Sequence, residues 1–337
     1  MTLKSNLTID DIARELGVSK TTVSRAISGK GRISAATRER VQAYIELHNY
    51  RPSAAAKGLA ESRTYNLALV LPKDFIALDI PFVRATMSAI CEEAFLHDYN
   101  VMVCVSTDDH NTSLVRTLDY RKVDGVILTR TVEHDAQLEL LTSRGTPFAT
   151  LGSLPARNRG AAMVEADHDH IGGGYEICKM LMGGSSIKTA LLVNDLNYVV
   201  NQSRLSGFRR ACQELSLPVE QTPVRTGIND EEKCRPAVEE LLALGVRRFI
   251  CTDEDLSIRA YNVLKSKGLR IPEDVEIASL SDSEILLRTE PPITALCFDA
   301  AELGRAACRE LLNALNNEPY QAKPLLGYQI RKRGSTR

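Results

Sequence analysis

The sequence has no tryptophan, no long hydrophobic run and no closely spaced pair of cysteines. No apolar stretch approaches the roughly 18 residues that a membrane-spanning helix requires, which excludes a chain that crosses a bilayer. The N-terminal residues also lack the hydrophobic core of a secretion signal, so we expect a cytoplasmic protein. The eight cysteines form no C-x-x-C motif. Buried free thiols in a reducing compartment are therefore the expected state.

The length and charge distribution indicate more than one domain. A chain of 337 residues is expected to fold as two or three domains. Residues 1–65 hold eleven Lys and Arg against six Asp and Glu, whereas the remainder holds 31 against 37. A basic segment on an acidic body suggests a small module that binds a polyanion, although a chance fluctuation would look the same on charge alone.

Residues 8–50 show the pattern of three short helices. Thr8, Ser19 and Ser34 each precede a helical pattern and can cap its first turn, and Gly17 can end the first helix. Two helices joined by a tight turn, with a third that completes the core, predict a helix-turn-helix. The residues expected to form the common core are Ile12, Ala13, Leu16, Val23, Ala26, Ile27, Val41, Tyr44, Ile45 and Leu47.

The second helix of a helix-turn-helix lies in the major groove of DNA. On this helix Lys20, Thr21 and Arg25 can reach base edges, and an arginine pairs well with guanine. The neighbouring serine and threonine hydroxyls suit phosphate oxygens. The expected DNA contacts in this segment are Thr8, Ser19, Lys20, Thr21, Thr22, Ser24 and Arg25.

Residues 8–59 resemble the DNA-binding head of the lactose-repressor/galactose-repressor family, through the motifs G-V-S-x-x-T-V-S-R and Y-R-P-S-A-x-A-x-x-L. The resemblance implies a homodimer on double-stranded operator DNA. It also implies a hinge helix that forms on the operator, in which Leu59, near Lys57, enters the minor groove as a wedge. The segment AAAKGLA is too short to be a stable helix alone in water, which fits this behaviour. An ordinary interdomain linker is the alternative.

From residue 66 onward, runs rich in Val, Leu and Ile alternate with helical patterns. This alternation predicts two parallel-sheet lobes with helices on both faces. Ligands of such sheets bind at the carboxyl ends of the strands, which makes the cleft between the lobes the candidate site. The expected strands are 67–71, 101–105, 126–128, 148–151, 190–193, 249–251 and 275–280, and the expected helices are 82–97, 111–121, 134–144, 201–215, 230–244 and 255–267.

Residues 66 to about 331 resemble the regulatory domain of the same family, which has a periplasmic-binding-protein fold. The implied fold class is an all-α helix-turn-helix head followed by an α/β regulatory domain of two lobes. The implied divisions are the head at 7–52, the hinge at 53–63 and the regulatory domain at 64–337, with an N-lobe of 64–163 and 293–325, a C-lobe of 164–292 and 326–337, and crossings near 163, 292 and 325.

Effector-binding residues follow from the resemblance one motif at a time. Arg204 matches the arginine of the family's S-x-R-x-x-G-F motif, which binds effector hydroxyls or a carboxylate, and a surface ion pair is the alternative. Asp282 stands where the family has a strand-end acceptor, with a loop cap as the alternative. Asp253 is expected to face the cleft and Phe82 to begin a helix of the opposite lobe.

The expected pocket also departs from the family pattern. Ile80 replaces a usual asparagine, Val83 replaces a frequent aromatic residue, and Gly152 occupies a position that is often aspartate. Tyr198 or Phe298 could supply the missing aromatic surface. A pentose or hexose is the expected effector, and a nucleobase, an acidic sugar or a phosphorylated metabolite stays open.

Two further segments, 167–170 and 172–174, have both a functional and a simpler structural interpretation. The segment 167–170, Asp-His-Asp-His, could bind a metal, but its match to the family's lobe crossing favours a hinge that lines the cleft. The glycines 172–174 lack the G-x-G-x-x-G spacing and follow no evident buried strand, which argues against a dinucleotide site. No catalytic motif occurs, so we expect neither enzymatic activity nor a cofactor or metal.

Together these observations predict a transcription regulator, most simply a repressor, that binds a palindromic operator as a dimer. A small-molecule effector in the cleft would control it. The alternatives are a sugar receptor without DNA binding and a sugar- or nucleotide-modifying enzyme on the same α/β core. A phosphocarrier-protein partner in place of a sugar also stays open.

Overall fold

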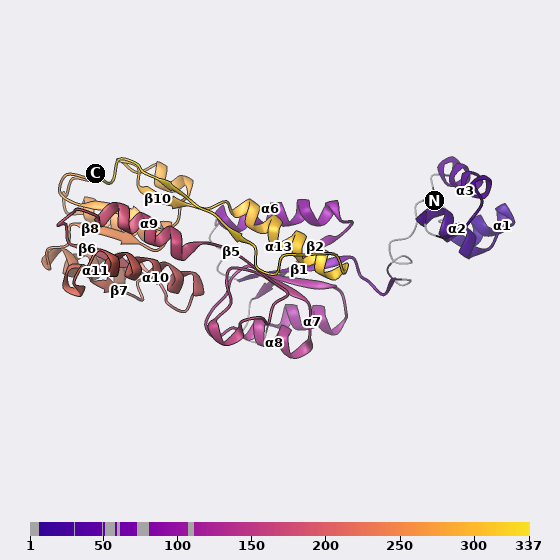
Figure 1. The fold of residues 1–337 in the computed structure, drawn as a ribbon, viewed down its shortest axis with the longest axis horizontal. Coiled ribbons are helices and arrows are strands. Elements are labelled where there is room, and N and C mark those ends of the chain that lie inside the picture. The colour runs from indigo at the N-terminus through magenta and orange to yellow at the C-terminus, as the bar shows by residue number, and fades with distance from the viewer. Residues whose placement is uncertain are drawn as a thin grey trace, which may run out of the picture. The chain divides into compact units, whose positions relative to one another are not determined.

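The computed structural model describes residues 7–29, 31–48, 50, 58, 61–72, 81–106 and 111–337. Its contacts divide the chain into two units, Met1–Thr64 and Tyr65–Arg337 (Figure 1). Lys57 and Leu59, the residues expected in the hinge helix, lie outside the described residues. Among the helices described, none has both the length and the apolarity needed to cross a membrane.

The first unit contains the three expected helices, α1 (Ile9–Leu16), α2 (Lys20–Ser28) and α3 (Ala35–Leu47). The core residues Ile12, Ala13, Val23, Ala26 and Val41 are buried together. The expectation for Leu47 was wrong, because its side chain is 80% exposed. At about 100° per residue, Leu47 lies roughly 120° around α3 from Val41 and so points away from the core.

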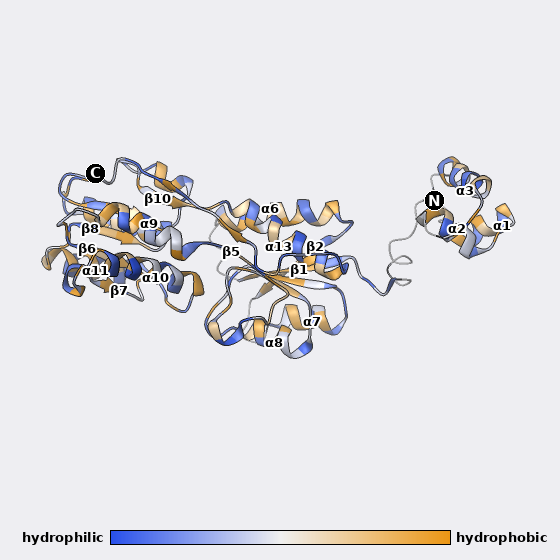
Figure 2. Ribbon diagram, in the orientation of Figure 1, coloured by the Kyte–Doolittle hydropathy of each residue, from blue (hydrophilic) through white to orange (hydrophobic). Residues whose placement is uncertain are grey.

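The second unit begins with a parallel sheet in the order β11-β5-β4-β3-β1-β2. One face packs against α6 and α13, and the other packs against α7 and α8. The strands are hydrophobic along most of their length (Figure 2). The elements are β1 (Asn66–Pro72), α6 (Pro81–Leu96), β2 (Asn100–Ser106), α7 (Thr112–Asp119), β3 (Gly125–Leu128), α8 (Ala136–Arg144), β4 (Phe148–Leu151), β5 (Val164–His168), α13 (Ala300–Leu315) and β11 (Leu325–Leu326).

The second lobe is built on a sheet in the order β12-β10-β9-β8-β6-β7. Helices α9 and α10 cover one face, and α11 and α12 cover the other. All pairs are parallel except β10 with β12. The elements are α9 (His170–Met182), β6 (Thr189–Leu192), α10 (Val199–Glu214), β7 (Val224–Arg225), α11 (Glu231–Ala243), β8 (Arg248–Cys251), α12 (Glu254–Ser266), β9 (Glu276–Ser279), β10 (Thr294–Cys297) and β12 (Gln329–Arg331).

The lobe crossings fall later in the chain than the expected positions near 163, 292 and 325. Strand β5 pairs in the first sheet and β10 in the second, so the chain crosses after 168 and after 297, and again between 326 and 329. Both strands carry polar residues inside the sheet, among them Glu165 and Thr294. Their hydrophobic pattern is therefore too weak to mark them in the sequence.

Glycines let α9 and α10 approach closely. A Cβ at Gly207 of α10 would lie 2.5 Å from the Ile171 carbonyl oxygen of α9, and one at Gly174 of α9 would lie 3.3 Å from the Arg204 carbonyl oxygen of α10. The glycine run at 172–174 follows the buried strand β5, contrary to the expectation that no buried strand precedes it. Its role in the structure is helix packing.

Candidate functional site

The hydroxyl groups expected to contact phosphates serve as helix caps in the first unit. The Ser19 hydroxyl accepts a hydrogen bond from the Thr22 amide at 3.1 Å and lies 2.8 Å from the Thr22 hydroxyl. The Thr8 hydroxyl donates to Asp11 at 2.6 Å and accepts from the Asp11 amide. These bonds stabilise the first turns of α2 and α1. Phosphate contacts by the same side chains stay predictions.

The residues expected to read bases form an exposed surface on α2. Thr21, Ser24 and Arg25 are exposed, and Lys20 pairs with Asp10. Gly31 adopts a φ of 89°, and a Cβ there would lie 3.0 Å from Arg25 Cδ. The aliphatic part of Arg25 therefore rests against the loop that follows α2, while its guanidinium remains available to a partner.

In the second unit, Arg204 projects from α10 into the junction between the lobes. Its side chain is only 8% exposed. One terminal nitrogen donates to Asn201 at 3.5 Å, and Nε has no hydrogen-bond partner among the described residues. A buried guanidinium without a carboxylate in direct contact is costly, and burial lowers the pKa of Arg204. This arrangement is the strongest sign of a ligand-binding position in the described chain.

Three rings from two lobe crossings gather at the same junction. His168 and His170 flank the first crossing, and Phe298 follows β10. The ring centroid of Phe298 lies 5.0 Å from that of His168 and 4.4 Å from that of His170. Burial lowers the pKa of His168 to about 4 and places that of His170 well below its usual value. Both rings are therefore neutral near pH 7.

Three carboxyl groups interact electrostatically with Arg204, two from the start of α12 and one from β5. Asp253 caps α12, where it accepts from the Leu256 amide at 2.9 Å, and Glu254 follows it. Asp167 accepts from the Ser153 amide at 3.0 Å and from the Ser153 hydroxyl at 2.6 Å. Burial raises the pKa of all three carboxyl groups.

Tyr198 lies where the two lobes touch beyond the chain crossings. Arg130 of the first lobe lies over its ring at 4.9 Å and donates to its hydroxyl at 3.2 Å. The backbone of Val132 forms an isolated bridge with Tyr198. Tyr198 therefore belongs to an interlobe contact, which leaves no signal in the sequence because both partners lie in loops or helix ends.

Asp282, which is expected to accept effector hydroxyls, forms an ion pair with Arg333, and its contact with an effector stays a prediction. Both of its oxygens accept from Arg333, at 2.8 and 2.6 Å. The permanently charged partner explains the burial of this carboxylate without an effector. Phe82 is half-buried against the core of the first lobe.

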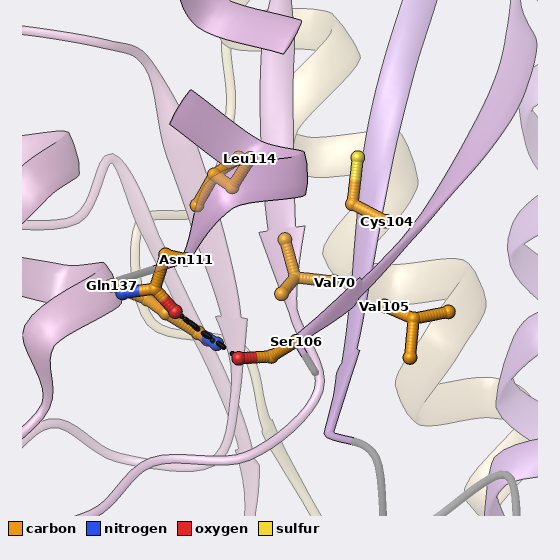
Figure 3. Close-up of a pocket in the computed structure, with 7 residues that line it drawn as sticks. All are labelled: Val70, Cys104, Val105, Ser106, Asn111, Leu114 and Gln137. Atoms are coloured by element: carbon orange, nitrogen blue, oxygen red, sulfur yellow. Dashed lines mark hydrogen bonds between the residues drawn. The ribbon is translucent and has the colours of Figure 1, made fainter. Parts of the chain in front are cut away.

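A small pocket of the first lobe lies between β1, β2 and α7 (Figure 3). Ser106 Oγ and Gln137 Nε2 donate to Asn111 Oδ1 at 3.1 and 3.2 Å. These polar groups satisfy one another, and the remaining lining is aliphatic apart from Cys104. The pocket is separate from the residues around Arg204. Within the described ranges, no three His, Cys, Asp or Glu side chains are grouped as metal ligands.

Comparison with known proteins agrees with both units. Residues 8–53 match the family of bacterial regulatory proteins of the lacI type, and residues 188–336 match the periplasmic binding protein-like domain. Catabolite control protein A of Streptococcus mutans is 28% identical, with 100% of both chains covered. The ribose operon repressor of Haemophilus influenzae is 28% identical, with 92% of each covered.

Solved structures support the same fold. The chain resembles the transcriptional regulator CelR in complex with cellobiose, at 24% identity, with 98% of this chain and 99% of that chain covered and a TM-score of 0.72. It also resembles the lac repressor dimer bound to operator and the anti-inducer ONPF, at 21% identity, with 98% and 99% covered and a TM-score of 0.75. The predicted fold class, a helix-turn-helix head with two parallel-sheet lobes, is thus confirmed. Residues 8–53 thus carry a domain of the lacI family of bacterial regulatory proteins, and residues 188–336 carry a periplasmic binding protein-like domain.

Proposed function

We propose that this chain represses transcription as a homodimer on a pseudo-palindromic operator, and that a small-molecule effector bound at Arg204 controls its affinity for DNA. The observation that carries the effector site is the buried Arg204 guanidinium whose Nε has no partner among the described residues. Such a group costs about 1–3 kcal/mol unless something completes its hydrogen bonds. A bound small molecule would do so.

The names of related proteins support a sugar as the effector. A ribose operon repressor is 28% identical to this chain, and a similar solved structure holds cellobiose. A cytoplasmic location and the absence of enzymatic activity remain part of this proposal, and relatives named as transcriptional regulators support them.

DNA binding is assigned to the head at 7–52, with the hinge at 53–63. The exposed side chains of α2 supply base contacts, and Lys57 and Leu59 supply minor-groove contacts. Two heads related by a two-fold axis would read half-sites about one helical turn apart.

Control by the effector is a linkage between two sites. Arg204 and Asp253 lie in the second lobe, whereas Asp167 is the next-to-last residue of β5 in the first lobe. A ligand that contacts both groups binds one lobe arrangement better than the other and shifts the population toward it. The lobe arrangement in turn sets the spacing of the two hinge segments and therefore the affinity for the operator.

The test is Arg204→Leu, with Arg209→Ala as the matched control because Arg209 is exposed on the same helix. The operator is first located by footprinting on genomic fragments, and a thermal-shift screen of sugars identifies the effector. Arg204→Leu should bind the operator like the wild type and lose the response to the effector. If calorimetry shows unchanged effector affinity in this variant, Arg204 does not bind the effector.

A further inference from the structure

The loop that follows α2 lies directly under the side chain of Arg25, the arginine expected to read a base. A Cβ built on Gly31 would meet Arg25 Cδ at 3.0 Å, Nε at 3.1 Å and Cγ at 3.2 Å. These distances are shorter than ordinary van der Waals contact, so only a residue without a side chain leaves room for Arg25. Gly31 also has a φ of 89°, in the region that residues with a Cβ rarely adopt. Both its backbone and its contact with Arg25 therefore require glycine.

Contacts from the rest of the head hold this loop in place. Gly29 caps the end of α2 with a φ of 70°, and its carbonyl oxygen accepts a hydrogen bond from Arg38 of α3 at 3.4 Å. On the other side of Gly31, the side chain of Ile33 packs against the core that the three helices share. Gly31 is thus fixed from both directions, and a fixed surface restricts the side chain that lies on it.

The two cations of α2 are held in different ways. Lys20 forms an ion pair with Asp10 of α1, so its ammonium group already has a partner that DNA has to displace or share. Arg25 is contacted by Gly31 along Cγ, Cδ and Nε, and the side chain is still exposed. The contact with Gly31 therefore restricts the direction of the Arg25 side chain without occupying the terminal N–H groups of the guanidinium.

This restriction matters for the recognition of a base. An arginine pairs with guanine through two parallel hydrogen bonds, which require one orientation of the planar guanidinium. A free arginine side chain loses much rotamer freedom when it takes up that orientation. A side chain that is already restricted in the unbound protein loses less, and it binds more tightly for the same contacts.

We propose that Gly31 is a positioning residue for DNA recognition: it holds the Arg25 side chain in the orientation in which its guanidinium pairs with one guanine of the operator. The preference of the protein at that base pair then depends on Gly31 as well as on Arg25. This inference rests on the proposed function, in which the exposed side chains of α2 contact bases.

The first test is Gly31→Ala in the full chain, titrated at fixed salt against the operator, its single-base variants and random DNA. The added methyl group displaces Arg25, so affinity for the operator should fall about tenfold, within the range expected for one bidentate pair. The loss should occur at the base pair that Arg25→Ala also affects. Random DNA is bound mainly through phosphates, and its affinity should stay that of the wild type. Equal losses on operator and random DNA would overturn the proposal.

The matched control is Gly29→Ala. Gly29 also has a positive φ and belongs to the same loop, but a Cβ there would have nothing within 4 Å. Alanine at this position therefore adds backbone strain without touching Arg25, and operator affinity should stay close to that of the wild type. A loss in Gly29→Ala as large as that in Gly31→Ala would show that strain in the loop, and not the position of Arg25, causes the effect.

A double variant separates positioning from a purely structural role. In an Arg25→Ala background, Gly31→Ala has no guanidinium to displace and should cause no further loss of operator affinity. Additive losses would overturn the proposal. Asparagine tolerates a positive φ better than other residues with a Cβ, so Gly31→Asn and Gly29→Asn repeat the comparison with less strain on the fold. The loss should again be confined to position 31.

A measurement without DNA reports on the Arg25 side chain directly. Nitrogen-15 relaxation of the full chain labelled with ¹⁵N-arginine gives an order parameter for each Nε–H group, and Arg25→Lys identifies the signal. We expect an order parameter above about 0.6 for Arg25 in the wild type and in Gly29→Ala, and a lower one in Gly31→Ala. A lower value already in the wild type, or no change in Gly31→Ala, would overturn the proposal.

Failure of this inference is distinguishable from failure of the proposed function. If Arg25→Ala loses operator affinity and Gly31→Ala does not, this inference is wrong and the proposed function stands. If Arg25→Ala binds the operator like the wild type, the base contact assigned to Arg25 is wrong, and the inference with it. Absence of any operator footprint would overturn the proposed function, and the order parameters would still decide whether Gly31 restricts Arg25.

Discussion

Arg333 and Asp282 form a bidentate ion pair in which two guanidinium nitrogens donate to the two carboxylate oxygens at 2.8 and 2.6 Å. The Asp282 side chain is only 4% exposed. The pair anchors the last residues of the chain, where Ser335 accepts from the Ile277 amide and donates its own amide to Pro292. The C-terminal segment is thus part of the second lobe, between β9 and β10.

Removal of one partner of this pair should destabilise the protein strongly. Asp282→Ala would leave the Arg333 guanidinium buried without its carboxylate, a change that typically costs about 3–5 kcal/mol of unfolding free energy. The double variant Asp282→Ala with Arg333→Ala should lose less than the sum of the single variants. Urea denaturation of the four proteins measures the coupling, and additive losses would show that the pair contributes nothing specific.

Arg25→Ala should weaken operator binding by about 1–3 kcal/mol and relax the preference at one base pair. The exposed guanidinium contributes little to the fold, so the melting temperature should stay close to that of the wild type. Fluorescence titrations at fixed salt, on the operator and on single-base variants of it, check both effects. Wild-type affinity in this variant would mean that α2 does not read the operator as proposed.

Leu59→Ala should weaken specific binding far more than non-specific binding. A side chain that enters a base step acts only where the operator can bend, whereas random DNA is bound mainly through phosphates. Titration of both DNAs at the same salt concentration separates the two contributions. Equal losses on operator and random DNA would show that the hinge segment only connects the two units and makes no specific contact with the operator.

His168 should make the stability of the second unit depend on pH. Its pKa is about 4 in the folded chain and about 6.5 when unfolded, so the unfolded state binds the extra proton between these values. The stabilising contribution of the neutral ring is therefore complete above pH 6.5 and is lost as the pH falls toward 4, by about 3 kcal/mol. Denaturation of the wild type and of His168→Gln across this range measures the difference, with His134→Gln as control. Parallel pH profiles would contradict the shift.

The local pattern of the sequence determined most of the fold. The three helices of the head begin at the expected caps, since Thr8, Ser19 and Ser34 act on their own first turns. The strongly apolar strands and their helices also follow from periodicity. The strands β5 and β10 do not follow from periodicity, because they contain polar residues, such as Glu165 and Thr294, that tertiary contacts bury.

The sequence by itself determined two kinds of domain, the likeness of the head to the lacI family and the place of Arg204 on a helix of the second lobe. Only the tertiary structure decided which residues surround that arginine. His168, His170 and Phe298 come from two chain crossings that are about 130 residues apart and meet only when both sheets have formed. Asp282 was likewise assigned by the structure to Arg333, because a contact across 51 residues depends on the path of the C-terminal segment and leaves no local signal in the sequence.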